Sequence, residues 1–420
     1  MIFQTKRFSA SWDTWMYYHD GLYYLYYLIT EKCGGEGFGV ASSPDGVHWD
    51  DHGAAILASD KMVNYLGTGS VWKSAHSDYA GKFFCNYSEW RKVGDEVRQN
   101  ILFAVSDDLI HWEKFGDEHM FSPDTAFYKE FTREMARWDC IYAIPKSGGG
   151  YYGIWTASPK AFIGIGLGES DDGLSWRALP SPEITLGALA ASGGDELESG
   201  AICFHEGLYY MMLGNIHLPE GVMTYTASDP KGPWMPMEKN NVMFSNRSFL
   251  HVYFPRLFDS PDGLLCNFHS LERANNEHGR PITWLTPIKQ AVFDTEGTMR
   301  LKYRKNNDIA KGSPTDSVSA NCIVEGVLAG DAMTLVLENS KNVRVVFGDG
   351  GVVRYYRGQD IIEEYQRDIA LSPRTHIRIM IRCGMTEIYA NDWYIGNYTA
   401  ESDLAGIEGL AEMRVWNWAE

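Results

Sequence analysis

Two signatures recur along this 420-residue chain and restrict the folds that it can adopt. The first, a glycine followed by any residue and two aromatics, begins at Gly21, Gly81, Gly149 and Gly207, with a weaker copy at Gly263. The second places a serine six residues before a tryptophan, in segments 43–49, 106–112, 170–176 and 228–234. Successive copies of the first lie 60, 68, 58 and 56 residues apart. A nearly constant period of this size, filled with short strands and turns, is typical of β-propeller blades.

The sequence therefore predicts an all-β protein that begins with a five-bladed β-propeller. Each repeated glycine should lie in the turn after the innermost strand of a four-stranded blade. After residue 319 the blade signatures end, and short alternating strands replace them. We expect a propeller domain at 1–305, a polar, turn-rich linker at 306–318, and a β-sandwich domain at 319–420.

Charge and composition argue against several classes of binding partner. A net charge of −18 argues against nucleic acid and against anionic membranes, since both require a basic surface. No run of 18 apolar residues occurs, and the seven cysteines never form a CxxC pair. We therefore expect a cytoplasmic protein with reduced cysteines, no metal and no cofactor. Its expected partner is a small carbohydrate, and the sequence leaves open whether the protein forms a homodimer.

Three carboxylates stand at equivalent positions of the repeat. Asp13, Asp139 and Glu198 lie 8, 10 and 9 residues before the glycine of their own repeat, and Ser70 and Tyr253 take comparable positions in blades two and five. Innermost strands of all blades line one channel, so these side chains should converge. Two carboxylates that flank a glycosidic bond are the minimum for its hydrolysis. The simpler interpretation of a single acid at such a position is that it caps a turn or pairs with an arginine. Three acids at the same position of the repeat favour a catalytic site.

Aromatic and basic side chains near these acids are candidates for sugar binding. Tryptophans of the repeated turns, such as Trp49, are assigned to packing. For Trp15, Trp72 and Trp138 the sequence does not separate stacking on sugar from packing in the core. Guanidinium groups can bind sugar hydroxyls. The complete set of substrate-binding candidates is Trp15, Ser70, Trp72, Arg137, Trp138, Tyr253 and Arg256.

The order of these features resembles glycoside hydrolase family 32, the family of invertases, inulinases and levanases. An aspartate in blade one, an aspartate in blade three, a glutamate in blade four and a final sandwich follow that plan, and segments 378–392 and 406–418 resemble its sandwich. The resemblance implies a retaining, exo-acting enzyme on β-fructofuranosides such as sucrose or short fructo-oligosaccharides. It implies Asp13 as nucleophile, Asp139 as transition-state stabiliser and Glu198 as acid/base, with Asp13 ionised while Glu198 holds a proton.

The local motifs depart from those of family 32. Its Asn-Asp-Pro-Asn-Gly is Trp-Asp-Thr-Trp at residues 12–15, its Arg-Asp-Pro is Arg-Trp-Asp at 137–139, and its Glu-Cys-Pro is Glu-Ser-Gly at 198–200. Two alternatives therefore stay open. One is an inverting arabinofuranosidase or xylosidase similar to family 43, which shares the propeller and the two-Asp, one-Glu plan. The other is a sugar-binding propeller whose catalytic set has decayed.

Overall fold

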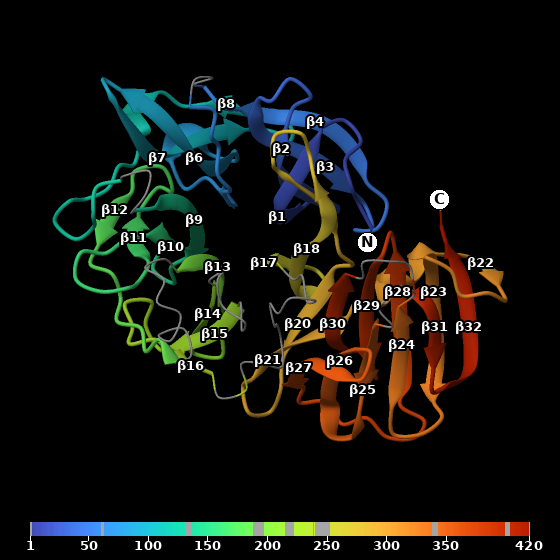
Figure 1. Cartoon of the computed structure of the whole chain (residues 1–420). Helices are drawn as coiled ribbons and strands as arrows, with labels where there is room; N and C mark the ends of the chain where they lie inside the picture. The colour runs from blue at the N-terminus through green and yellow to red at the C-terminus, as the bar shows by residue number, and fades with distance from the viewer. Residues whose placement is uncertain are drawn as a thin grey trace.

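The computed structural model describes residues 2–59, 63–131, 136–187, 197–214, 222–237, 239, 253–337, 343–399 and 404–419. Figure 1 shows a ring of small sheets built by the N-terminal part of the chain and, beside it, a stack of longer strands built by the C-terminal part. Strands dominate both regions, and the helical segments are short. The predicted all-β fold, a propeller followed by a sandwich, is confirmed.

Each blade is an antiparallel sheet of four strands, and its first strand precedes the repeated glycine. Blade one holds β1 (Ala10–His19), β2 (Leu22–Thr30), β3 (Glu36–Ser43) and β4 (Asp50–Leu57), and blade two holds β5 (Val71–Lys73), β6 (Phe83–Val93), β7 (Glu96–Ser106) and β8 (Glu113–Lys114). Blade three holds β9 (Trp138–Pro145), β10 (Tyr151–Ala157), β11 (Gly166–Ser170) and β12 (Arg177–Leu179), and blade four holds β13 (Glu198–His205), β14 (Leu208–Gly214), β15 (Val222–Ala227) and β16 (Met235–Pro236). Blade five holds β17 (Tyr253–Ser260), β18 (Gly263–Asn275), β20 (Lys289–Phe293) and β21 (Met299–Tyr303). Short 3-10 helices lie at η1 (Ser77–Tyr79) and η2 (Asp117–His119).

The serine-to-tryptophan signature forms the turn between the third and fourth strands. In blade one the Asp45 carboxylate accepts hydrogen bonds from the backbone N–H groups of Val47 (2.7 Å) and His48 (2.8 Å), and Ser43 Oγ accepts one from the N–H of Gly46 (2.8 Å). Asp108 and Asp172 make the corresponding bonds in blades two and three. The side chains thus replace backbone partners in a tight turn, which explains why the signature repeats.

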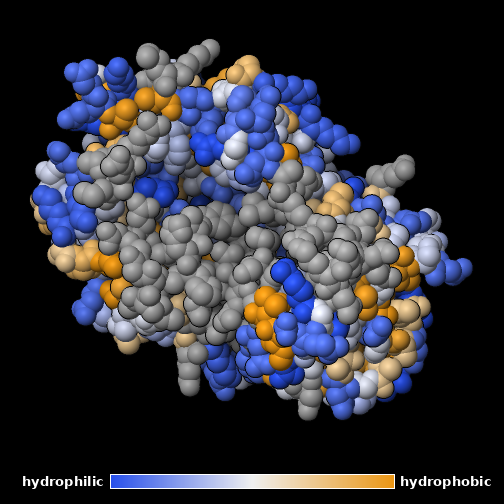
Figure 2. Space-filling view, viewed as in Figure 1, coloured by the Kyte–Doolittle hydropathy of each residue, from blue (hydrophilic) through white to orange (hydrophobic). Residues whose placement is uncertain are grey.

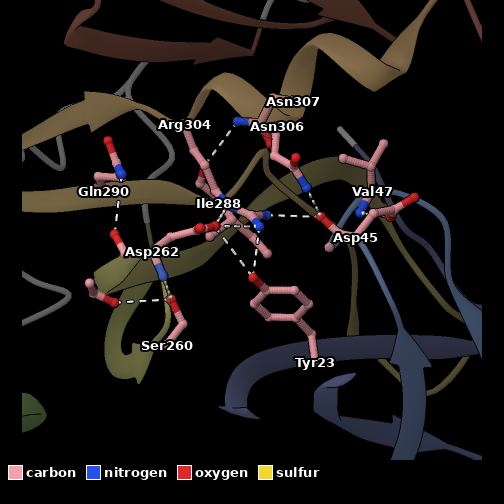
Figure 3. Close-up of polar contacts among 12 residues, drawn as sticks. Tyr23, Asp45, Val47, Ser260, Asp262, Ile288, Gln290, Arg304, Asn306 and Asn307 are labelled. Carbon is pink, nitrogen blue, oxygen red and sulfur yellow. Dashed lines mark hydrogen bonds and ion pairs between the residues drawn. The ribbon is translucent and has the colours of Figure 1, made fainter. Parts of the chain in front are cut away.

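Two sets of contacts close the ring between blade five and blade one. First, β19 (Pro281–Leu285) pairs with β18, meets β1 at Ser11, and exchanges backbone hydrogen bonds with residues 2 and 3. Second, the buried guanidinium of Arg304 donates to the Tyr23 hydroxyl (2.7 Å), to Asp262 Oδ2 (2.9 Å) and to the Asp45 carbonyl (2.9 Å), as Figure 3 shows. The Arg304 side chain therefore ties both ends of the ring together.

The C-terminal region consists of two stacked sheets. One contains β22 (Lys311–Thr315), β23 (Asn321–Leu328), β28 (His376–Arg382), β29 (Met385–Ala390), β30 (Trp393–Thr399) and β32 (Leu410–Trp418); the other contains β24 (Met333–Leu337), β25 (Val343–Phe347), β26 (Val352–Arg357), β27 (Asp360–Gln366) and β31 (Leu404–Glu408). An apolar core that includes Val324, Leu335 and Ile379 fills the space between them. The predicted linker contains most of η5 (Lys305–Ala310) and β22; η6 (Asp349–Gly351) precedes β26. The exact domain boundaries stay predictions.

The sandwich packs directly on blade five. Strand β30 pairs with β21, so one sheet runs from the propeller into the sandwich. Beneath it the fully buried Lys289 Nζ lies 2.5 Å from Glu387 Oε2 and 3.9 Å from the centre of the Phe268 ring. Breaking such a buried pair on one side leaves an uncompensated charge, so it fixes how the two regions fit together.

On the face shown in Figure 2 the coloured residues are mostly hydrophilic. Figure 2 shows hydrophobic residues on the visible face only in small groups among hydrophilic ones. In the part of the chain described above, none of the helices is long and apolar enough to cross a bilayer.

Candidate active site

The innermost strands are irregular at the positions of the three carboxylates. In β1 the pairing with β2 shifts between Trp12 and Thr14, and Asp13 itself has a φ of 44°. In β9 the register shifts just after Asp139, where Cys140 has a φ of 48°. A third shift follows Glu198, between Ser199 and Ala201 of β13. Bulges of this kind re-aim side chains, and they turn these carboxylates toward the propeller axis.

The three predicted carboxylates meet in one cavity of about 130 Å³, which we call the acid pocket. Asp13, Asp139 and Glu198 come from blades one, three and four, so the sequence-based prediction that they converge is correct. The remaining lining consists of Trp12, Leu28, Tyr65, Leu66, Gly67, Thr68, Arg137, Cys140, Thr156 and Arg280.

Asp139 is held by groups from blade two and by its own strand. Its Oδ2 accepts hydrogen bonds from the Tyr65 hydroxyl (3.0 Å) and from Arg137 Nη2 (3.0 Å), and its Oδ1 accepts a short one from Ser88 Oγ. Trp90 stacks on the Tyr65 ring at 4.4 Å, which fixes that hydroxyl. A Cβ at position 67 would collide with Ser88 Oγ and with the Asp139 carboxylate, so the close approach of the chain requires Gly67.

Asp13 lies in a desolvated environment, although 22% of its side-chain surface is exposed. Burial is the main cause that raises the pKa of Asp13 to about 7; the Glu198 carboxylate adds to the shift and the Arg256 guanidinium opposes it. The ring of His269 approaches Asp13 Oδ1 at 3.9 Å. Because burial lowers the pKa of His269 to about 3, that ring is neutral and the contact is not an ion pair. With a pKa of about 7, the Asp13 carboxyl group in the free protein is divided between its protonated and ionised forms at neutral pH.

Two arginines lie close enough to the three carboxylates to affect their charge. Arg137 Nη1 lies 3.4 Å from Glu198 Oε1 while its Nη2 contacts Asp139, so a positive charge lies between two carboxylates. Arg256, buried to 2% exposure, donates through Nη1 to the carbonyls of Gly200 (2.5 Å) and Ser199 (3.3 Å). Its Nη2 lies 3.4 Å from Thr68 Oγ1. Arg256 therefore joins blades five, four and two at the bulge that carries Glu198.

Several predicted sugar-binding residues lie elsewhere. Trp15, Ser70 and Trp72 line a different cavity, described below, and Trp138 is fully buried among core aromatics with its indole N–H bonded to the Phe121 carbonyl. Arg137 lines the acid pocket as predicted, whereas Arg256 lies outside its lining and contacts backbone rather than open space. The side chain of Tyr253 lies outside the described residues.

Several residues of the pocket lie outside the set of sugar-binding candidates chosen from the sequence. Trp12 is the tryptophan that lines the acid pocket. The Arg280 guanidinium lies 5.3 Å from the centre of the Trp12 ring and donates a hydrogen bond of 2.7 Å to the Glu36 carboxylate. Tyr65 and Ser88 carry no repeat signal. Only the run Gly-Thr-Gly-Ser at 67–70 could have indicated a close backbone approach in blade two.

Residues 13–184 match the model of the glycosyl hydrolases family 32 N-terminal domain. Solved structures with the same fold include sucrose-6-phosphate hydrolase from Lactobacillus gasseri (TM-score 0.73, 15% identity, covering 98% of this chain and 91% of that one). A family 32 β-fructofuranosidase from Bombyx mori gives a TM-score of 0.69 at 12% identity, with 98% and 91% coverage. Fructan 1-exohydrolase IIa from Cichorium intybus, in complex with 1-kestose, gives 0.68 at 11% identity, with 100% and 97% coverage. No curated protein sequence matches this chain.

The match over residues 13–184 confirms the resemblance to family 32 that was predicted from the sequence, and with it the glycosidase class of the enzyme. The solved structures confirm the fold over nearly the whole chain.

Proposed function

We propose that this family 32-like glycosidase hydrolyses β-fructofuranosides, such as sucrose or short fructo-oligosaccharides, one terminal residue at a time and with retention of configuration. One observation carries the proposal: three carboxylates from three blades surround a single small cavity within a chain that matches the family 32 domain. The small size of this cavity, about 130 Å³, favours an exo mode of action over the binding of a long chain.

In the first step Asp13, as the carboxylate, attacks the anomeric carbon of the bound fructosyl ring. The glycosidic carbon–oxygen bond breaks, and Glu198 transfers its proton to the leaving oxygen. The product of this step is a fructosyl ester of Asp13 together with the free leaving alcohol. Glu198 is placed for the proton transfer because its carboxyl group lines the same cavity as Asp13.

In the second step the ionised Glu198 removes a proton from water, whose oxygen attacks the anomeric carbon and releases Asp13 as a carboxylate. Two inversions at one carbon give net retention. Asp139 does not form a bond in either step. Its carboxylate, oriented by Tyr65, Ser88 and Arg137, accepts hydrogen bonds from ring hydroxyls and stabilises the positive charge that develops on the sugar.

Arg256 is a positioning residue in this scheme. Its two bonds to carbonyls of β13 hold the bulge beside Glu198, and its positive charge favours the ionised form of Asp13. A substrate-binding role was predicted for it from the sequence; its contacts with backbone carbonyls favour the positioning role instead.

The proposal is tested by incubating purified protein with sucrose, 1-kestose, short levan oligomers and aryl arabinofuranosides, and by recording the anomeric form of the first product by NMR. We expect fructose release with the β configuration retained. Release of arabinose with inverted configuration would support the family 43-like alternative. Binding of sugars without hydrolysis of any would support the decayed propeller.

A further inference from the structure

A second cavity, of about 710 Å³, lies at the other end of the propeller channel. On three of the inner strands its lining residues follow those of the acid pocket along the chain: Tyr17 follows Asp13 on β1, Ile144 follows Asp139 on β9, and His205 follows Glu198 on β13. Because the inner strands run in the same sense from the acid end, the two cavities occupy opposite ends of one channel. We call the second one the aromatic cavity.

Aromatic rings make up much of its wall. They include Tyr17, Tyr18, Trp72, Tyr142, Phe204 and Phe293. Phe204 is 58% exposed, so its ring is accessible to a ligand. His205 stacks on Phe293 with ring centres 3.8 Å apart and planes 8° from parallel. The cavity thus offers flat ring faces from several blades.

Several of these rings are fixed before any ligand arrives. The Tyr142 hydroxyl donates to the Leu257 carbonyl of blade five, and the Tyr151 hydroxyl donates to the Lys73 carbonyl of blade two. Both bonds cross from blade three to another blade. Rings held in this way lose little conformational freedom on binding, so less of the interaction energy is lost to ordering.

Polar groups of both signs lie among the rings. Lys73 and Asp259 are exposed residues of the wall, and Tyr17 contributes a hydroxyl to the same lining. Burial raises the pKa of Tyr17 to about 12, so this hydroxyl keeps its proton and can donate a hydrogen bond. A strongly charged ligand would be repelled by either Lys73 or Asp259, whichever carries the same sign of charge. The net charge of −18 further disfavours the binding of anions.

We propose that the aromatic cavity is a second, non-catalytic binding site for a neutral saccharide of one to a few rings. Ring faces pack on the C–H faces of a sugar, and the Tyr17, Lys73 and Asp259 groups bind its hydroxyls. Its volume of about 710 Å³ falls within the range of roughly 300–1,000 Å³ typical of small-molecule sites. This site does not depend on the proposed hydrolysis, because binding at the aromatic end needs none of the three carboxylates.

The experiment is isothermal titration calorimetry of a Glu198→Gln variant with sucrose, 1-kestose, maltose and xylobiose, repeated after adding Phe204→Ala or Tyr17→Phe. We expect at least one sugar to show a binding event that Phe204→Ala weakens about fivefold or more and that Tyr17→Phe weakens about fivefold. Phe162→Ala, which removes a 48% exposed ring that lines neither cavity, is the matched control and should leave that event unchanged.

The two proposals fail separately. A wild-type protein that hydrolyses none of the substrates overturns the proposed function, yet the Phe204-dependent event would still be present. Conversely, absence of any saccharide binding that responds to Phe204→Ala overturns the second site, even if hydrolysis is fast. Because Phe204 is exposed, the variant should keep the wild-type melting temperature, and this measurement verifies that it is folded.

Discussion

The two ends of the inner strands differ in how they are built. At the acid end the strands are bulged, Asp13 and Cys140 have positive φ angles, and charged groups meet across blades. At the aromatic end the same strands pair regularly, and tyrosine, phenylalanine and tryptophan rings fill the lining. Backbone strain of this kind is concentrated where side chains must point toward a site. The regular strand pairing further along the same strands stabilises the strained segments.

This difference separates two kinds of contribution. Substitutions at the acid end should change the chemical steps, because carboxylates and guanidinium groups there face the reacting bond. Substitutions at the aromatic end should change binding of a second sugar and leave turnover nearly intact. The following predictions test this separation in order of decreasing effect.

The largest effect is expected for Asp13→Asn. The amide has nearly the same shape but cannot attack the anomeric carbon, so kcat/KM should fall by roughly 10⁴-fold or more. Sugar binding by calorimetry should stay close to wild type, and the melting temperature at neutral pH should not fall below that of the wild type. Added azide should yield an azido sugar of inverted configuration. A variant that keeps much of its activity but loses stability would show that Asp13 only anchors β1.

Glu198→Gln should lower turnover on natural substrates by roughly 10²–10⁴-fold, because the transferable proton is lost. Aryl substrates with good leaving groups need little protonation, so their rates should fall less. Glu206→Gln is the matched control, since Glu206 lies exposed in the turn after the same strand, β13. Equal losses for both substrate classes would contradict the acid/base role.

The pH dependence follows from the raised pKa of Asp13. Only the carboxylate attacks, so the acid limb of the kcat/KM profile should lie near pH 7, and at pH 5 the protonation of Asp13 alone should lower kcat/KM about a hundredfold. Because the folded-state pKa is raised above the usual value of 3.8, folding stability is lost as pH increases through about 7. Asp13→Asn should therefore gain melting temperature relative to wild type at pH 8 but not at pH 4. If the residual turnover of the Asp13→Asn variant keeps the same limb, the limb belongs to another group.

Arg256→Met should give a smaller loss, about tenfold in kcat, because the bulge beside Glu198 loses its support. Removing the positive charge should also move the acid limb of the pH profile to higher pH, since Arg256 lowers the pKa of Asp13. Arg256→Lys keeps the charge and should restore the limb toward its wild-type position. An unmoved limb in Arg256→Met would leave only a structural role for this residue.

The sequence by itself determined the architecture and the identity of the acids. The repeated glycine signature specified five blades, because each blade needs the same turn after its first strand, and the serine-to-tryptophan signature marked the last turn in four of them. Nearly equal offsets from that turn placed Asp13, Asp139 and Glu198 at corresponding positions of three inner strands. Such positions must converge in a ring, so the acid pocket followed from spacing alone.

Only the tertiary structure decided which neighbours complete the site. Tyr65 and Ser88 reach Asp139 from another blade, and no local pattern marks them. The bulge at Asp13 interrupts the alternation of β1, so Trp12 lines the acid pocket whereas Trp15 lines the aromatic cavity. The protonation of Asp13 likewise depends on burial and on charges from blades four and five. The partners of Asp139, the placement of the two tryptophans and the protonation of Asp13 all depend on contacts between strands that are distant in sequence. A sequence repeat predicts where a strand lies in its blade, but it does not predict which side chains from other blades contact that strand.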